Sequence, residues 1–196
     1  MVMLLIVCLL GLFAQSSAQI RRQGSCPQPK SIPNFNETKL IGQWFEWARI
    51  DNAYQPDHVC GLTTYYRNND GVLIKAMSSI LRFPGTRLFW EGKMVPREST
   101  PTARYHMVFP DWSLETGLIS TYVAANWDHW VILHGCKQQG NQSLQFAWVW
   151  VKNPNLDGIY QRQISRVLEE INLPMRNLRG INQTNCPNHR SAGVCK

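Results

Sequence analysis

The sequence predicts an all-β fold of eight antiparallel strands followed by one helix. Of its 196 residues, 44% are hydrophobic and 11% aromatic, while 17% are charged, and this composition favours strands with large apolar contacts. Short segments rich in β-branched and aromatic residues, separated by Gly, Pro, Asn or Asp, fill residues 42–152. Helical spacing of apolar residues begins only after residue 152. Disorder of most of the chain and a coiled coil are therefore excluded, and strands are favoured over a helical bundle.

The N-terminal residues predict export. Residues 1–18 carry no charge and end in the small residues Ser16 and Ala18, which is typical of a signal peptide cleaved before Gln19. A membrane anchor is the alternative, but the apolar run of roughly a dozen residues is shorter than the ~20 that a spanning helix needs. We expect a signal peptide at residues 1–18 and a single secreted, extracellular domain at residues 19–196, with its core at about 26–187.

Surface features agree with an extracellular protein. Acceptor tripeptides for N-glycosylation begin at Asn36, Asn141 and Asn182. The formal charge of +7 arises from 20 Lys and Arg against 13 Asp and Glu, with no run of five like charges. This pattern indicates a generally basic surface, and we expect no nucleic-acid partner.

The eight strands are predicted at residues 42–50, 61–68, 72–82, 88–95, 104–109, 118–125, 130–137 and 144–152. Turn-forming residues at 68–71 and 138–141 make neighbouring strands antiparallel hairpins, so the chain is expected to run up and down. Both a sandwich and a closed barrel satisfy this pattern. A helix that comes after all the strands favours the barrel, because the helix can pack on the outer wall.

The helix is predicted by five apolar residues on one face, bounded by an Asn-Pro-Asn sequence at residues 153–155 and by Pro174. These residues are Ile159, Ile164, Val167, Leu168 and Ile171. A short extended segment is expected within residues 173–181.

Five cysteines remain once Cys8 leaves with the signal peptide, and they are Cys26, Cys60, Cys136, Cys186 and Cys195. None has the close spacing of a zinc site, so we expect structural disulfides and no metal. Two bridges among five cysteines can form in fifteen ways, and the spacing does not select one.

Motifs near both ends of the chain resemble the lipocalins, and within them the apolipoprotein D group and its invertebrate relatives. Residues 40–48 hold the Gly-x-Trp that opens the first lipocalin strand, here Gly42 and Trp44. Residues 146–156 and 183–187 are similar to the end of the apolipoprotein D-like chains. Two departures stand out: Lys152 replaces an arginine, and residues 125–127 read Ala-Asn-Trp where the family has Thr-Asp-Tyr.

The resemblance implies an eight-stranded up-and-down antiparallel β-barrel with one C-terminal helix packed outside it, closed at one end by Gly42, Trp44 and Lys152. It also implies disulfides between Cys26 and Cys136 and between Cys60 and Cys186. Cys195 is then left for a disulfide-linked partner.

Alternation along a strand predicts the inner wall. If Lys152 faces inward, Trp150 and Trp148 share its face. The same alternation, together with the resemblance, places five further side chains inside, namely Tyr65, Met77, Tyr105, Met107 and Tyr122, and leaves Trp90 undecided. A ring-filled core is the alternative to a ligand pocket at these positions.

The predicted function is a carrier of a small hydrophobic ligand, such as a fatty acid, steroid, retinoid, carotenoid or bilin, without catalysis and without a cofactor. A membrane surface or a receptor is a further expected partner. One alternative is an interaction protein that acts through loops or Cys195. Another is a haem- or thiol-dependent lipocalin enzyme, for which His134 and Cys136 are the only close His/Cys pair.

Overall fold

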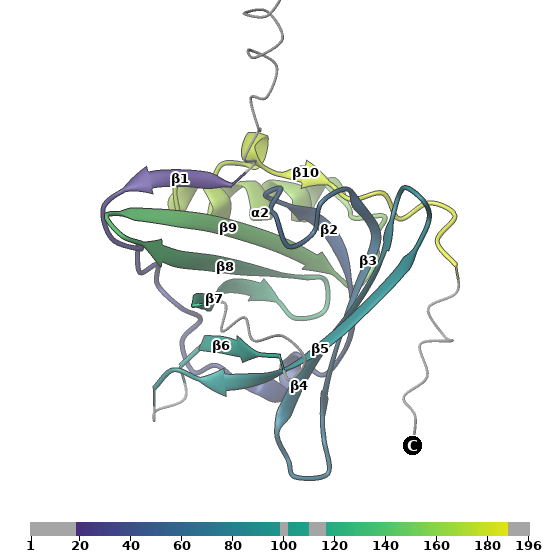
Figure 1. Cartoon of the computed structure of the whole chain (residues 1–196), viewed down its shortest axis with the longest axis horizontal. Coiled ribbons are helices and arrows are strands. Elements are labelled where there is room, and N and C mark those ends of the chain that lie inside the picture. Colours follow the sequence, from purple (N-terminus) through teal and green to yellow (C-terminus); the bar gives the residue numbers. More distant parts are fainter. Residues whose placement is uncertain (1–18, 99–101, 110–116, 188–196) are drawn as a thin grey trace, which may run out of the picture.

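The structure, a computed structural model, describes residues 19–98, 102–109 and 117–187 (Figure 1). Ten strands form one sheet: β1 (Ile20–Gln23), β2 (Gly42–Arg49), β3 (His58–Arg67), β4 (Leu73–Leu81), β5 (Arg87–Pro96), β6 (Arg104–Val108), β7 (Leu118–Asn126), β8 (Trp130–Gln139), β9 (Gln142–Val151) and β10 (Arg179–Gly180). The helical segments are η1 (Glu37–Lys39), α2 (Gly158–Glu170) and η2 (Met175–Asn177). The predicted signal peptide and Cys195 lie outside the described residues.

Strands β2 to β9 form a closed antiparallel barrel. Each pairs with the next along the chain, and β2 also pairs with β9, from Phe45 opposite Val151 to Arg49 opposite Trp148. This last pairing closes the sheet on itself and decides between the sandwich and the barrel. The predicted all-β, eight-stranded fold is confirmed, and every predicted strand end lies within three residues of the observed one.

Two short strands extend the sheet beyond the barrel. β10 pairs with β2 and falls within the extended segment predicted at residues 173–181. β1 was not predicted, because its sequence Ile-Arg-Arg-Gln has no alternation of apolar and polar residues. It pairs with β9 from Gln142 to Gln145, the part of β9 that precedes the residues paired with β2. A backbone edge left free by the barrel therefore orders a segment that has little apolar character.

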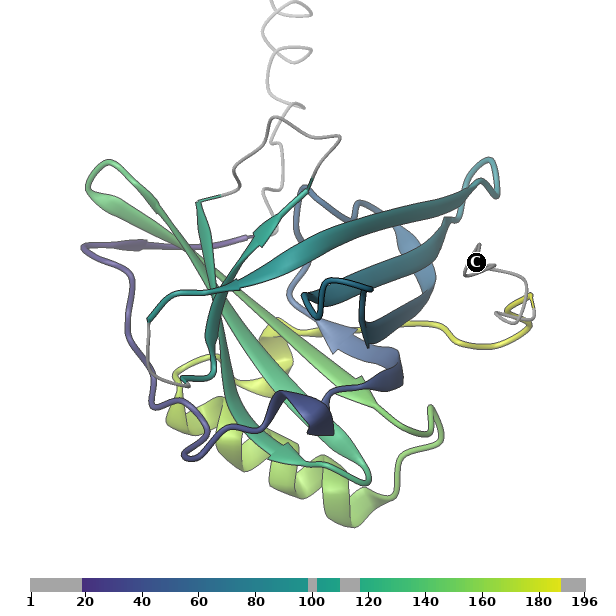
Figure 2. The same cartoon turned by 90° about the horizontal axis from the view of Figure 1, so that it is seen from below.

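Helix α2 packs against the outside of the barrel wall (Figure 2). Its N-terminus is capped by Asp157, whose side chain accepts a hydrogen bond from the amide of Ile159. Ile164 and Leu168 are fully buried among outward-facing residues of β2, β8 and β9. Ile159 was predicted on this apolar face but is 50% exposed, so the contact begins one turn later than the pattern indicates.

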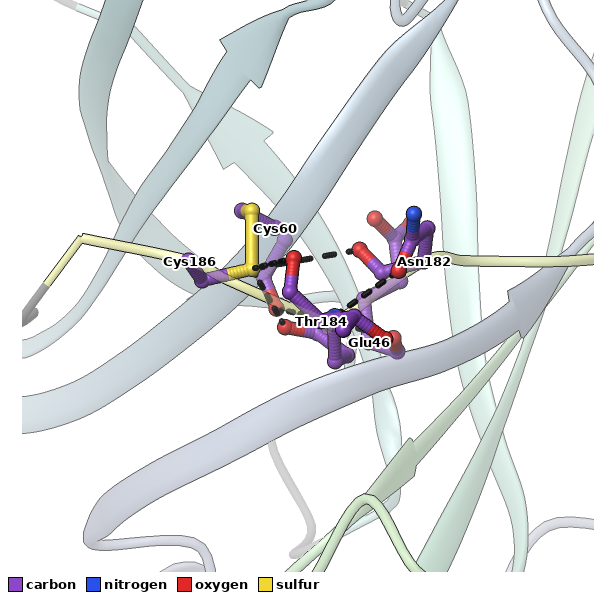
Figure 3. Close-up of a disulfide and its surroundings, with 7 residues drawn as sticks. Glu46, Cys60, Asn182, Thr184 and Cys186 are labelled. Atoms are coloured by element: carbon purple, nitrogen blue, oxygen red, sulfur yellow. Dashed lines mark hydrogen bonds between the residues drawn. A yellow bond between two sulfur atoms is a disulfide. The ribbon is translucent and has the colours of Figure 1, made fainter.

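Two disulfides tie the terminal segments to the barrel, and they are the two pairs that the resemblance implied. Cys26 is bonded to Cys136 on β8, and Cys60 on β3 is bonded to Cys186 (Figure 3). The second tether is reinforced by Gln183, whose Nε2 donates to the backbone oxygens of Glu46 and Gly61 at 2.8 and 2.9 Å. The segment after β10 is thus fixed across two strands of the barrel.

A search of the described ranges for helices long and apolar enough to cross a bilayer gives none.

The contact of α2 with the wall predicts a stability difference between two helix variants. Leu168→Ala removes a fully buried side chain and is expected to lower the free energy of unfolding by about 2–5 kcal/mol. Ile159→Ala, on the same helix but half exposed, is expected to cost about 0.5 kcal/mol or less. Urea unfolding followed by circular dichroism measures both, and equal losses in the two variants would contradict the packing described here.

Candidate functional site

One end of the barrel is closed by residues of β2 and by Lys152. Gly42 has φ +105°, a conformation that residues with a side chain rarely adopt. The Trp44 ring is fully buried and its Nε1 donates to the carbonyl of Leu40 at 2.7 Å. Lys152 Nζ lies 3.6 Å from the centroid of this ring and donates to the carbonyl of Gln43 at 3.2 Å. A lysine therefore makes a cation–π contact at the position where the family has an arginine.

The three tyrosines expected on the inner wall point inward but fill the closed end. Tyr122 donates its hydroxyl to that of Tyr65 at 2.8 Å, and Tyr105 donates to Glu37 of η1 at 2.8 Å. Phe35 stacks on Tyr122 with ring centroids 5.3 Å apart. Because Phe35 enters from the segment before β2, strand alternation gives no sign of it. None of the three tyrosines lines the cavity described next.

A cavity of about 80 Å³ lies inside the barrel. Four of the expected residues line it: Met77, Met107, Trp148 and Trp150. Trp90, left undecided by the sequence, also lines it. The remaining lining residues are Glu46, Tyr54, Gln55, Gly61, Leu62, Thr63, Lys75, Ser78, Phe109, Leu118, Ser120 and Leu133. The volume is below the ~300–1,000 Å³ of pockets that enclose drug-sized ligands, so the free barrel has room for a narrow group.

A buried ion pair borders the cavity. Glu46 and Arg49 are 2% and 0% exposed, and Arg49 Nη1 lies 2.9 Å from Glu46 Oε2. Burial raises the pKa of Glu46, and the charge of Arg49 opposes this rise. Glu46 fits beside β3 only because residue 61 is glycine, since a Cβ there would lie 2.7 Å from the Cβ of Glu46.

The ion pair also anchors the loop between β2 and β3. Arg49 Nη2 donates to the carbonyls of Gln55 and His58, at 2.9 and 3.2 Å. The Gln55 side chain donates to Glu46 at 3.3 Å and accepts from Trp148 Nε1 at 2.8 Å. The loop is thereby bound to β2 through its backbone carbonyls and the Gln55 side chain, and to β9 through the contact of Gln55 with Trp148.

Lys75 is the second charged group at the cavity. It is 5% exposed, and its Nζ lies 4.0 Å from the centroid of Trp150 and 5.9 Å from that of Tyr65. Among the described residues no acidic side chain comes within 4.0 Å of it. Burial lowers the pKa of Lys75 to about 7, with the charge of Glu46 opposing the shift.

Sequence reasoning missed Glu46 and Lys75, although a signal was present. Glu46 lies two residues after Trp44 and Lys75 two residues before Met77, so alternation places both on the inner face. Charged residues are mostly exposed in proteins, so alternation alone is a weak indication that a Glu or a Lys faces the interior.

The remaining candidate sites have the following environments. Asn36, Asn141 and Asn182 are exposed, and the Asn36 side chain accepts from the amide of Thr38 at 3.0 Å. Cys136, the cysteine of the one close His/Cys pair, is held in a disulfide. No group of three or more metal-ligating side chains occurs within the described part of the chain.

Comparison with known proteins establishes the family. The sequence profile of the lipocalin-like domain matches residues 36–171, which is more than half of the chain. This protein is a lipocalin. Apolipoprotein D of Macaca fascicularis is 26% identical over 95% of this chain and 97% of its own length. The bilin-binding protein of Pieris brassicae is 25% identical over 76% of this chain and 78% of its own.

Solved lipocalin structures share the fold. The insecticyanin of Manduca sexta superposes with a TM-score of 0.70 at 17% identity, covering 84% of this lipocalin and 89% of that chain. Lobster apocrustacyanin A1 gives 0.69 at 17% identity, covering 83% and 91%. The barrel is therefore retained although most of the side chains differ.

The burial of Lys75 predicts a pH dependence of stability for this lipocalin. In the unfolded chain a lysine titrates near about 10.4, whereas folded Lys75 titrates at about 7. Between these values the unfolded chain holds the extra proton, so the free energy of unfolding is expected to rise with pH, by up to about 1.4 kcal/mol per pH unit. Lys75→Met is expected to reduce this rise, leaving the contribution of Lys152, whose pKa burial also lowers, and Lys93→Met, on an exposed residue of β5, is expected to retain the full rise. Urea unfolding of the three proteins above pH 7 measures this, and a rise in Lys75→Met equal to that of the parent protein would contradict the assignment.

Proposed function

We propose that this lipocalin is a secreted carrier that binds a small hydrophobic ligand inside its barrel and performs no chemistry on it. The observation that carries the proposal is the cavity lined by Trp90, Trp148, Trp150, Met77 and Met107 within a closed sheet. Indole rings give large contact area with little loss of side-chain freedom, and methionines adapt to irregular shapes. The names bilin-binding protein and apolipoprotein D, borne by two relatives, agree with a ligand or lipid carrier.

Ligand entry requires the cavity to widen. Tyr54, on the loop between β2 and β3, lines the wall and is partly exposed, whereas Gln55 is held in place by its hydrogen bonds to Glu46 and Trp148. Met77 on β4 and Met107 on β6 can change rotamer. Removing about 300 Å² of ligand apolar surface from water gives ~7 kcal/mol before association losses, which limits the affinity from apolar burial alone to about 10 μM.

Secretion is supported by three features of the chain. Residues 1–18 have the composition of a signal peptide. The two disulfides are typical of proteins that fold in an oxidising compartment. The three glycosylation tripeptides begin at exposed asparagines. We propose that the chain is exported and that its mature domain begins at Gln19.

A surface role alongside transport is favoured by one observation. Phe83 and Phe89, on the hairpin between β4 and β5, are 77% and 59% exposed. Exposed apolar side chains of this size are typical of contact sites. We propose this hairpin as the surface through which the carrier meets a membrane or a receptor.

The carrier function is tested by filling the cavity. Met77→Trp is expected to weaken binding roughly tenfold or more, because the larger ring occupies the small volume available to the ligand. Thr86→Trp, in the exposed turn between β4 and β5, is the matched control and is expected to bind as the parent protein does. Tryptophan fluorescence during titration with retinol, progesterone, palmitic acid and biliverdin measures the dissociation constants. No fluorescence change with any of the four, together with no adduct in native mass spectrometry of the secreted protein, would refute the carrier proposal.

Export is tested by expressing the full chain in a cell with a secretory pathway. The protein is expected in the medium with Gln19 as its N-terminal residue, and peptide N-glycosidase is expected to lower its mass. Asn36→Gln, Asn141→Gln and Asn182→Gln, made singly, identify which positions carry glycans. Retention of residues 1–18 on a membrane-bound product would favour the anchor instead.

A further inference from the structure

We propose that the ligand is a single-chain amphiphile with a carboxylate head, bound with the carboxylate against Lys75 and the tail directed away from the closed end. This inference rests on the proposed carrier function and specifies the class of ligand. It follows from the charges inside the barrel, from the position of Lys75 along the barrel, and from the small volume of the cavity.

The charges of the barrel interior leave one cation without an anion. Glu46, Arg49 and Lys75 are the charged residues among the buried ones. Glu46 and Arg49 pair with each other at 2.9 Å, so their charges cancel. Among the described residues Lys75 makes ring contacts with Trp150 and Tyr65 but no ion pair, although the charge of Glu46 acts on it from a longer distance. An unpaired ammonium removed from water is costly, which is why burial lowers the pKa of Lys75, and a monoanion at this position would stabilise the protonated form.

The charge of the missing partner selects a carboxylate. One surplus positive charge is matched by one negative charge. A phosphate monoester, which carries about −1.5 to −2 at neutral pH, would leave excess negative charge beside Glu46. A neutral alcohol, ester or sterol would leave Lys75 unpaired. Among common lipid head groups, the carboxylate therefore fits the interior best.

Lys75 lies toward the closed end of the cavity, which sets the direction of the ligand. In the sheet it is opposite Tyr65, part of the tyrosine cluster that fills the closed end. Its ammonium lies on Trp150, two residues from Lys152 at the barrel closure. Met77 continues the wall on the same strand face, with Trp90 opposite it on β5. A ligand whose polar head lies at Lys75 would therefore place its tail along the apolar wall formed by Met77 and Trp90.

The small volume of the cavity favours one narrow chain. A volume of about 80 Å³ is that of only a few water molecules. A carboxylate and the first methylenes of an unbranched chain enter such a space with side-chain adjustments alone. A fused-ring steroid or a bilin would have to displace several indoles of the wall at once, against the close packing of a protein interior.

The experiment compares cis-parinaric acid with its methyl ester, two fluorescent probes that share one tail and differ only in the head group. The folded full-length mature protein is titrated with each, and so are Lys75→Met and Lys93→Met. The parent protein is expected to bind the acid roughly tenfold or more tightly than the ester, since a buried charge-assisted contact is made only with the acid. Lys75→Met is expected to bind both probes with the affinity of the ester. Lys93→Met, which removes an outward-facing lysine of β5, is expected to retain the preference.

The outcomes separate the inference from the function on which it rests. Equal binding of acid and ester by the parent protein would overturn the carboxylate assignment and leave the carrier function standing. A preference that survives in Lys75→Met would overturn the role of Lys75. Binding of retinol without binding of either parinaric probe would refute the ligand class alone, whereas failure of every hydrophobic probe would refute the carrier function. The acid–ester comparison in the parent protein needs no variant, so a folding defect in Lys75→Met leaves a decisive measurement.

Discussion

The backbone pairing of β2 with β9 is the constraint on which the rest of this structure depends. Without it, the eight strands would form an open sheet with two free edges, and inward-facing residues could reach water along either edge. With it, every second side chain of each strand is confined to the interior. Charged residues that occupy inward positions, Glu46 and Lys75, must then find partners inside the barrel or remain unpaired.

The closed end determines where a cavity can exist. Phe35 and the hydroxyl-linked Tyr65 and Tyr122 fill the volume next to η1, and the cavity lies beyond them, where Trp148 and Trp150 line it. The same rings form the boundary against which Lys75 lies. A barrel with smaller residues at the closed end would be deeper, but its polar groups would be hydrated. The aromatic rings at the closed end therefore keep water away from Lys75. In such an environment of low dielectric constant, one further charge interacts strongly with its side chain.

Most of the fold could be predicted from local sequence, and less of the site. Period-two alternation and turn residues identify β2 to β9, because each strand has its own pattern. Closure depends on a pairing between residues a hundred positions apart, which no local pattern encodes. The alternation pattern predicts that Tyr105 and Trp148 both face the interior, and both do. Only Trp148 lines the cavity. The difference arises from Phe35, which lies outside every strand and packs on the tyrosines. Whether an inward residue fills or lines space is thus a property of the assembled barrel.

The two buried cations of the interior have different structural consequences. Arg49 has an anion, and its remaining donors hold the loop between β2 and β3 through the carbonyls of Gln55 and His58. The charge of Arg49 therefore has partners within the fold itself. Lys75 makes no comparable bond among the described residues, and a methionine of similar length would pack against Trp150 without a desolvation cost. A contact with one ring offsets only part of that cost. The fold thus gives no structural need for an ammonium at position 75, and an anion from outside the chain supplies one.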